Sequence, residues 1–160
     1  MKPRQGKIHT LETLLPILAD HKRRGDVVVF TNGCFDILHK GHIRYLTEAR
    51  KQGDLLVIAV NTDATVREAK GPERPINPAA ERIELLAAFS FCDYVFEFFE
   101  PTPHEIIAQI VPDVLVKGGD WAADQIVGRD IVEAAGGKVV RINQVPGAST
   151  TNIVGKIRKN

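Results

Sequence analysis

Two histidines, His39 and His42, lie three residues apart, shortly after an apolar run and a small polar turn. The run at 27–30 leads into Thr31-Asn32-Gly33, where the glycine allows the backbone to turn tightly. If a helix begins near Gly41, both imidazoles share one face and its free N–H groups point at the same region. Imidazoles donate hydrogen bonds to phosphate oxygens and add charge when protonated. The segment therefore predicts a phosphate site, although two isolated histidines more often cap or line a helix.

Three further polar segments follow apolar runs, as loops at the ends of strands do. They are 61–63 (Asn-Thr-Asp), 117–121 (Lys-Gly-Gly-Asp-Trp) and 145–151. A single polar loop is usually only a solvated turn. Ligands of open α/β sheets bind outside the carboxyl ends of the strands, so several polar strand ends at one edge predict a shared site.

The segment Ser149-Thr150-Thr151 precedes apolar residues at 153, 154 and 157, so it is expected to form the first turn of a final helix. Its hydroxyl groups and free N–H groups would hold a second anion beside the one at the histidines. Simple capping of the helix by Ser149 or Thr150 is the alternative.

Four more residues are candidates for chemistry. Lys70 begins the segment KGPERP, which is typical of a mobile loop, and could reach a reacting phosphate, although most surface lysines have no such role. Arg82 could assist Lys70 or pair with a carboxylate. Trp121 could stack on a base or cover a sugar, or pack at the rim of the core. Cys34 lies beside the histidines, but the spacing does not match a zinc site, so no metal ligand is predicted.

The composition is that of an ordinary globular protein of one domain, with 160 residues, 44% hydrophobic residues, 26% charged residues and a net charge of +1. This balance gives no indication of a nucleic-acid or membrane partner. The two cysteines, Cys34 and Cys92, argue against a disulfide scaffold and for a reducing cytoplasm. No leader-like apolar segment and no run of about 18 apolar residues occurs, so we expect neither export nor membrane anchoring.

Hydrophobic periodicity predicts strands separated by helices. A helix over 10–23 comes first and ends at Arg24-Gly25. The expected strands cover 27–30, 55–61, 94–96, 114–117 and 138–142. The expected helices cover 41–51, 78–89, a segment after 102–105, 128–135 and a segment from 149. A polar loop is expected after residue 61. We expect Pro78 and Pro103 at first helical positions, a capping box at Thr102 to Glu105, and a helix end at Gly136-Gly137. This alternation predicts an α/β fold: a Rossmann-like five-stranded parallel sheet with helices on both faces, preceded by an N-terminal helix.

The segment at 31–42, TNGCFDILHKGH, resembles the GxFDxxHxGH-type motif of the nucleotidylyltransferase superfamily, in which paired histidines hold a triphosphate. The match is specific, because it fixes a glycine, Phe35-Asp36 and both histidines at set spacing after a strand. The resemblance extends to further segments and covers nearly all of residues 27–157, which are similar to the D-glycero-β-D-manno-heptose 1-phosphate adenylyltransferases. The further segments that carry it are 61–63, 70–75, 112–120 and 149–153. The part at 113–121 discriminates best, because related glycerol-phosphate cytidylyltransferases usually have a different loop there.

This resemblance implies transfer of AMP from ATP to a heptose 1-phosphate, which releases pyrophosphate and forms ADP-heptose for lipopolysaccharide core synthesis. It implies Mg²⁺ as cofactor, held mainly by the ATP phosphates, and a homodimer, which is common in related families. In many bacteria this domain is fused to a sugar kinase. These 160 residues hold no kinase-sized segment, so we expect the stand-alone form, with a helical extension at 1–25 and a nucleotidylyltransferase domain at 26–160.

The resemblance also implies roles for individual residues. His39, His42 and Lys70 would stabilise the transition state, while Asp36 would orient the acceptor or the metal. The nucleotide-binding set is Thr31, Asn32, Gly33, Cys34, Phe35, His39, His42, Lys117, Gly118, Asp120, Ser149, Thr150 and Thr151; the substrate-binding set is Asp36, Asn61, Asp63, Arg82 and Trp121. Many superfamily members have an arginine after the Ser-Thr motif. This chain has Asn152 there, so the sequence does not identify the cation that faces the γ-phosphate.

Two other functions are compatible with the motif. A cytidylyltransferase that acts on glycerol 3-phosphate or a similar small alcohol phosphate would share the histidines and the Ser-Thr-Thr turn. A non-catalytic nucleotide sensor would keep the fold without turnover, but the intact His39, His42 and Lys70 argue against it.

Overall fold

The computed structural model describes residues 6–159, in which five parallel strands form one sheet. The strands are β1 (Val28–Gly33), β2 (Leu55–Asn61), β3 (Tyr94–Phe98), β4 (Val114–Gly118) and β5 (Lys138–Ile142). Their order is β3-β2-β1-β4-β5, and every neighbouring pair is parallel. The predicted sheet is confirmed. Because the chain moves outward from β1 first on one side and then on the other, the order reverses at β1, which is where α/β sheets bind ligands.

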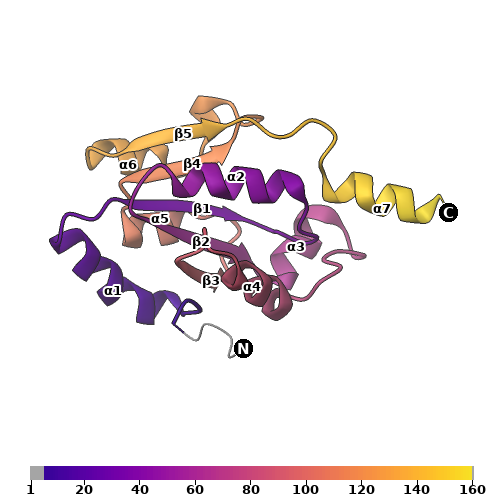
Figure 1. Cartoon of the computed structure of the whole chain (residues 1–160), viewed down its shortest axis with the longest axis horizontal. Helices are drawn as coiled ribbons and strands as arrows, with labels where there is room; N and C mark the ends of the chain where they lie inside the picture. The colour runs from indigo at the N-terminus through magenta and orange to yellow at the C-terminus, as the bar shows by residue number, and fades with distance from the viewer. Residues whose placement is uncertain (1–5, 160) are drawn as a thin grey trace.

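The described part also has seven α-helices and one short 3₁₀ helix, of which α1 precedes β1 and α7 follows β5 (Figure 1). The α-helices are α1 (Leu11–Arg23), α2 (Lys40–Arg50), α3 (Asp63–Lys70), α4 (Ala79–Ala88), α5 (His104–Ile110), α6 (Arg129–Ala134) and α7 (Thr150–Arg158). The 3₁₀ helix η1 spans Ala123–Gln125. None of the described helices is long and apolar enough to span a membrane.

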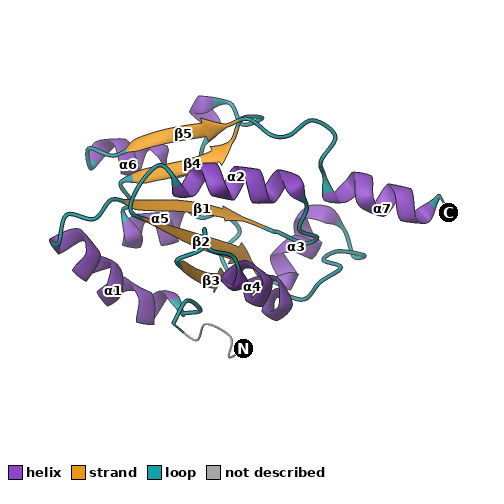
Figure 2. Ribbon diagram, viewed as in Figure 1, coloured by secondary structure: helices purple, strands orange, loops and turns teal. Residues whose placement is uncertain are grey.

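The sheet separates two apolar cores, because alternate residues of each strand point to opposite faces. Figure 2 shows helices in front of and behind the sheet. One core packs α1, α5 and α6 against the face that carries Val28 and Phe30. The other packs α2 and α4 against the face that carries Val29. Helices therefore cover both faces, as predicted, and the polar ends of the strands stay free for a site.

The helix predicted as an N-terminal extension belongs to the main core. Leu14 and Leu18 of α1 are fully buried against β1 and β3. Gly25, which follows the helix, has a φ of 85°, so the predicted end at Arg24-Gly25 is confirmed. The helix thus fixes one face of the sheet and lies away from the site.

The segment expected as a polar loop after β2 is instead largely helical. Thr62 caps α3, because its side chain accepts a hydrogen bond from the Thr65 N–H at 3.2 Å. Val66 is the buried residue that holds α3 against the body. Lys70 therefore ends a helix, and the loop begins only at Gly71, which has a φ of 100°.

Two predicted helix starts differ in detail. Pro78 and Pro103 occupy the N-cap positions of α4 and α5, one residue before the first helical turn, and neither helix has a side-chain cap. The capping box at Thr102 to Glu105 was therefore wrong, since the helix begins at His104. Asn77 precedes the N-cap position of α4, and its side-chain nitrogen donates to the Asp36 carbonyl at 2.7 Å. The predicted end of α6 is confirmed at Gly136, with a φ of 84°.

The last helix, α7, lies beyond the end of the sheet (Figure 1). None of its nine residues is buried. Ser149 caps it by accepting from the Asn152 N–H at 3.0 Å, and Thr150 Oγ1 donates to the Ile37 carbonyl at 3.2 Å. The predicted start of this helix is confirmed, and its first turn is tied to the turn that follows β1.

Candidate active site

A polar pocket of about 450 Å³ lies at the carboxyl ends of β1, β2 and β4. The first turns of α2 and α7, the end of α3 and the loop after β5 complete its wall. The predicted residues that line it are Asn32, Gly33, Cys34, Phe35, His39, His42, Asn61, Lys70, Lys117, Gly118, Trp121, Ser149, Thr150 and Thr151. The structure thus gathers most of the predicted site from segments far apart in the sequence.

The histidine rings stack, with their centroids 3.9 Å apart and an angle of 26° between their planes. His39 is the N-cap of α2, and its Nδ1 accepts a hydrogen bond from the Gly41 N–H at 3.1 Å. In the neutral ring the proton must then lie on Nε2, which makes Nε2 a donor. A Cβ at Gly41 would lie 2.9 Å from the His39 ring and 3.1 Å from the Ala148 Cβ, so only glycine allows the α7 loop to approach this closely.

Both histidines are neutral near pH 7 in the free protein. Burial lowers the pKa of His39. Burial, together with smaller effects of the neighbouring His39 and Lys70, lowers the pKa of His42 to about 4. His42 Nδ1 is buried and has no hydrogen-bond partner among residues 6–159. The rings therefore act as hydrogen-bond donors and not as standing cations.

Lys117 reaches into the pocket from the end of β4. Its Nζ donates to Asn32 Oδ1 and lies 6.0 Å from the centre of the Trp121 ring. Burial lowers the pKa of Lys117 to about 8. Trp121 is 48% exposed, so its ring is available to a ligand. The two residues form a cationic and aromatic corner on the β4 side.

Thr31 lies beneath the pocket and is fully buried. Its Oγ1 is 2.8 Å from the Tyr45 hydroxyl, and both groups donate toward the Val116 carbonyl. Burial raises the pKa of Tyr45 to about 12, so this phenol stays neutral. Thr31 therefore joins β1 to α2 and β4, and it is not among the residues that line the pocket.

Asp36 also differs from its expected role. It is 2% exposed, and its carboxylate accepts hydrogen bonds from the N–H groups of Ile76 and Asn77 at 2.8 and 2.9 Å. A third bond comes from Arg74 Nε at 2.9 Å. Burial alone would raise the pKa of Asp36, but these bonds lower it below its usual value. These bonds occupy the carboxylate, so in this structure Asp36 positions the segment after α3, whereas the resemblance implied that it orients the acceptor or the metal.

Arg82 and Asp63, both expected to bind substrate, lie outside the pocket. Arg82 is fully buried, and its guanidinium donates to Asp63 Oδ1 at 2.7 Å and to the Cys34 carbonyl at 2.6 Å. Asp63 also accepts from the Ala79 N–H at 2.9 Å. This pair joins α3 to α4 and supports the turn after β1 from below. The sequence could not reveal this structural role, because an arginine and an aspartate are as typical of a substrate-binding site as of a buried ion pair.

Asp120 lies outside the pocket too, in an exposed position. Its Oδ1 accepts from Gln144 Nε2 at 3.1 Å, and Gln144 is itself part of the wall. The remaining wall residues are Gly41, Tyr45, Arg74, Gln144, Val145 and Ala148, of which Gly41, Val145 and Ala148 lie in segments that the sequence assigned to the site. Tyr45 could have been found, because it lies three residues after His42 on the same helical face. Arg74 could not, because its place depends on the long-range contact with Asp36.

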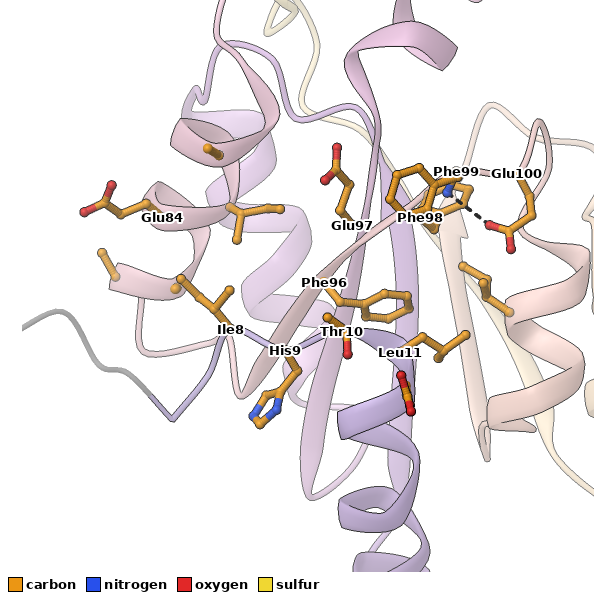
Figure 3. A pocket seen from close by; sticks show the side chains of 16 residues that line it. Ile8, His9, Thr10, Leu11, Glu84, Phe96, Glu97, Phe98, Phe99 and Glu100 are labelled. Atoms are coloured by element: carbon orange, nitrogen blue, oxygen red, sulfur yellow. Dashed lines mark hydrogen bonds between the residues drawn. The ribbon is translucent and has the colours of Figure 1, made fainter.

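A second and larger hollow, of about 990 Å³, lies beside β3 and α4 (Figure 3). Its wall is mainly apolar and includes Ile8, Phe96 and Phe99. Its charged residues are carboxylates, among them Glu84 and Glu100. Carboxylates repel phosphate, so the smaller pocket is the candidate site for an anionic ligand.

The pocket chemistry suits a cation that is bound mainly by its ligand. No group of three or more His, Cys, Asp or Glu residues within 6–159 is placed to hold a metal ion. The wall instead offers the amides of Asn32 and Asn61 and the hydroxyl groups at the start of α7. A Mg²⁺ ion bound to a nucleoside triphosphate keeps most of its ligands as phosphate oxygens and water, so this wall fits it.

The fold and the site together define a class: a doubly wound α/β protein with a pocket suited to an anionic ligand, formed by helix N-termini at the edge where the strand order reverses. The chain belongs to the cytidylyltransferase-like family, whose model matches residues 30–156. That match begins after α1 and includes every part of the pocket wall.

Within the matched segment, about half of the residues of two curated relatives are identical to those of this chain. It is 52% identical over 152 residues to the bifunctional protein HldE of Syntrophotalea carbinolica and 54% identical over 151 residues to HldE of Pseudomonas fluorescens. These matches cover 95% and 94% of this chain but 31% and 32% of those proteins. The chain thus spans about a third of the length of the curated relatives it matches.

Two solved structures are similar to this chain to different degrees. A lipopolysaccharide core biosynthesis protein from Thermoplasma volcanium GSS1 is 32% identical, with a TM-score of 0.66, and the match covers 76% of this chain and 99% of that one. Pantoate-β-alanine ligase from Francisella tularensis is 13% identical, with a TM-score of 0.63, covering 96% of this chain and 79% of that one. The second likeness shows the fold alone.

Proposed function

We propose that this chain transfers AMP from ATP to D-glycero-β-D-manno-heptose 1-phosphate, forming ADP-heptose and pyrophosphate. The observation that carries the proposal is the meeting of His39, His42 and Lys70 with the first turn of α7 in one pocket. The relative from Thermoplasma volcanium is described as a lipopolysaccharide core biosynthesis protein, which favours a sugar phosphate as acceptor.

The reaction needs positioning and charge stabilisation more than covalent chemistry. An oxygen of the sugar phosphate attacks the α-phosphorus of ATP, and the bond to the β-phosphate breaks in line with it. The sugar phosphate is already an anion at pH 7, so no general base is needed. Negative charge grows on the oxygens around the α-phosphorus and on the departing pyrophosphate.

Each part of the pocket has a role in this transfer. His39 Nε2–H, the His42 ring and the Lys70 ammonium stabilise the charge at the α-phosphorus. Thr150, Thr151 and the free N–H groups at the start of α7 hold the pyrophosphate. Gly33, Cys34 and Phe35 offer backbone groups at the turn, and the corner formed by Lys117, Gly118 and Trp121 receives ribose and adenine.

A divalent cation accompanies the nucleoside triphosphate in this family generally, and we propose Mg²⁺ for this chain. When bound, the ion would neutralise part of the triphosphate charge. The protein contributes hydroxyl and amide groups around it, and Lys70 supplies a further positive charge.

The proposed partners are ATP and the sugar 1-phosphate, without nucleic acid or membrane. We place the protein in the cytoplasm, where the free thiols of Cys34 and Cys92 stay reduced. A homodimer remains a prediction from the family resemblance. Light scattering would test it, since a dimer has twice the 17.6 kDa mass of the chain.

Pyrophosphate release with Mg²⁺ tests the proposal. ATP or CTP would be offered with D-glycero-β-D-manno-heptose 1-phosphate, with its α-anomer, or with glycerol 3-phosphate. Selective turnover of ATP with the β-heptose phosphate is the expected result. Turnover of CTP with glycerol 3-phosphate would make the chain a cytidylyltransferase. Nucleotide binding without turnover, unchanged by Lys70→Ala, would make it a sensor.

A further inference from the structure

Arg74 is a cation in the pocket wall to which the transfer described above gives no role. Its side chain is 13% exposed and lies in the wall together with Lys70 and Asn61. Nε donates to Asp36 Oδ2 at 2.9 Å. Within residues 6–159 no hydrogen bond joins the two terminal nitrogens to the protein, and neither is among the buried atoms that lack a partner. These nitrogens therefore remain available to a ligand.

The contact with Asp36 fixes the direction of the guanidinium. The Asp36 side chain is 1% exposed and is itself held by the Ile76 and Asn77 N–H groups. A guanidinium held at Nε keeps its two terminal nitrogens free as a planar fork. That fork matches two oxygens of a phosphate, so Arg74 forms a preorganised phosphate-binding group.

The sheet order indicates which phosphate Arg74 faces. The nucleotide corner of Lys117 and Trp121 comes from the end of β4, whereas Asn61 ends β2, and these strands lie on opposite sides of β1. Lys70 and Arg74 follow β2 along the chain and line its side of the pocket. The helix N-termini of α2 and α7, which would hold the triphosphate, lie between the two sides. An acceptor that attacks in line must approach from the side opposite the leaving pyrophosphate. The β2 side of the pocket is therefore where the acceptor would bind.

We propose that Arg74 binds the phosphate of the acceptor sugar 1-phosphate through its two terminal nitrogens, with Asp36 as the residue that positions it. This inference rests on the proposed function and adds the residue that recognises the acceptor. It separates the pocket into a nucleotide side at β4 and an acceptor side at β2, with the histidines between them.

Steady-state kinetics of Arg74→Gln and Arg74→Lys test the inference, with each substrate varied in turn. Loss of a bidentate charged contact is expected to raise KM for the sugar phosphate about 10- to 100-fold in Arg74→Gln, while KM for ATP changes less than about twofold. Arg74→Lys keeps the positive charge but loses the planar fork of donors, so its KM for the acceptor should lie between those of the unaltered protein and of Arg74→Gln. Asp36→Asn should raise the same KM without changing that for ATP.

Arg67→Gln is the matched control, because Arg67 is an exposed arginine on α3, outside the pocket wall. It should leave both KM values unchanged. An Arg74 variant that raises KM for ATP alone would assign Arg74 to the triphosphate and overturn the inference. Unchanged KM values in a folded Arg74→Lys and Arg74→Gln would reduce Arg74 to a structural partner of Asp36. Absence of turnover by the unaltered protein would instead overturn the proposed function itself.

Discussion

His42 is the residue whose environment departs most from that of an ordinary surface histidine. It is neutral at physiological pH, stacks on His39, and has one buried ring nitrogen that finds no hydrogen-bond partner within the described residues 6–159. A rigid neutral donor of this kind is a preorganised group for charge that develops in a transition state.

We expect His42→Ala to lower kcat by roughly 10² or more, as the loss of one preorganised donor does in other enzymes. The fold should survive, because the ring lies at the pocket and the α2 core residues Leu46 and Ala49 are untouched. Turnover with ATP and the heptose phosphate, measured beside a thermal melt, checks this. Unchanged kcat in a folded variant would remove His42 from the mechanism.

Lys117 predicts a specific pH dependence for nucleotide binding. Its pKa of about 8 lies below the ordinary value, so the ammonium is mostly charged at pH 7 and loses its proton as the pH rises through 8. If that charge helps to hold the nucleotide, KM for ATP should rise between pH 7 and 9. The two pocket histidines, which are neutral throughout this range, add no opposing change.

Lys117→Arg provides the control for this profile, because arginine stays charged at every pH in the range. KM for ATP in this variant should be nearly independent of pH from 7 to 9. A profile identical to that of the unaltered protein would show that another group is responsible.

At the scale of single residues, the sequence predicted best where local spacing decides. The interval between His39 and His42, with a helix starting between them, was enough to bring their rings together. The sequence predicted poorly where a charged residue could bind either a substrate or another residue of the protein. Asp36 and Arg82 are bound by Asn77, Arg74 and Asp63, residues that only the folded chain brings near them. No local pattern distinguishes such a buried ion pair from a substrate contact.

Among the helices, α7 is held least by packing. It buries none of its residues, and its recorded ties to the body are the bond from Thr150 to Ile37 and the exposed ion pair of Arg158 with Glu73. An exposed pair of this kind adds about 1 kcal/mol or less to stability. The first turn of α7 nevertheless forms part of the pocket wall, so a bound triphosphate would add contacts that the free helix lacks.

Hydrogen exchange should therefore distinguish α7 in the free and bound protein. We expect the amides of residues 152–158 to exchange quickly in the free protein and several-fold more slowly with ATP and Mg²⁺, since a ligand that binds the folded helix opposes its opening. The amides of α1 serve as an internal control, because this helix contributes no residue to the pocket wall. Protection at α2 without any change in α7 would contradict a role for α7 in holding the pyrophosphate.

At the scale of elements, alternating strands and helices were readable because buried parallel strands are continuous apolar runs. The helix α3 was missed for a physical reason: only Val66 of its eight residues is buried, so it carries almost no apolar stripe. Its start signal was present, since Thr62 and Asp63 form a cap and an acidic first turn. Proline at 78 and 103 marked the beginnings of α4 and α5 to within one residue, but not the absence of side-chain caps.

At the scale of the whole molecule, the reversal of strand order at β1 lets two ligands occupy one pocket from opposite sides. The nucleotide side and the acceptor side use different strands, and the helix N-termini lie between them. Nothing in this arrangement requires one substrate to leave before the other enters. The only thiol in the wall, Cys34, is 3.9 Å from Asn61 Oδ1 and has no imidazole or lysine among its recorded hydrogen-bond partners in 6–159.

This arrangement predicts a sequential reaction through a ternary complex, without a covalent AMP intermediate. Initial-rate plots against ATP at several acceptor concentrations should intersect, and labelled pyrophosphate should not exchange into ATP until the sugar phosphate is added. Cys34→Ser should keep most of the activity, because the thiol has no part in direct in-line transfer. Exchange without acceptor, abolished by Cys34→Ser, would mean that the protein itself first accepts AMP, and the histidines would then serve two transfers instead of one.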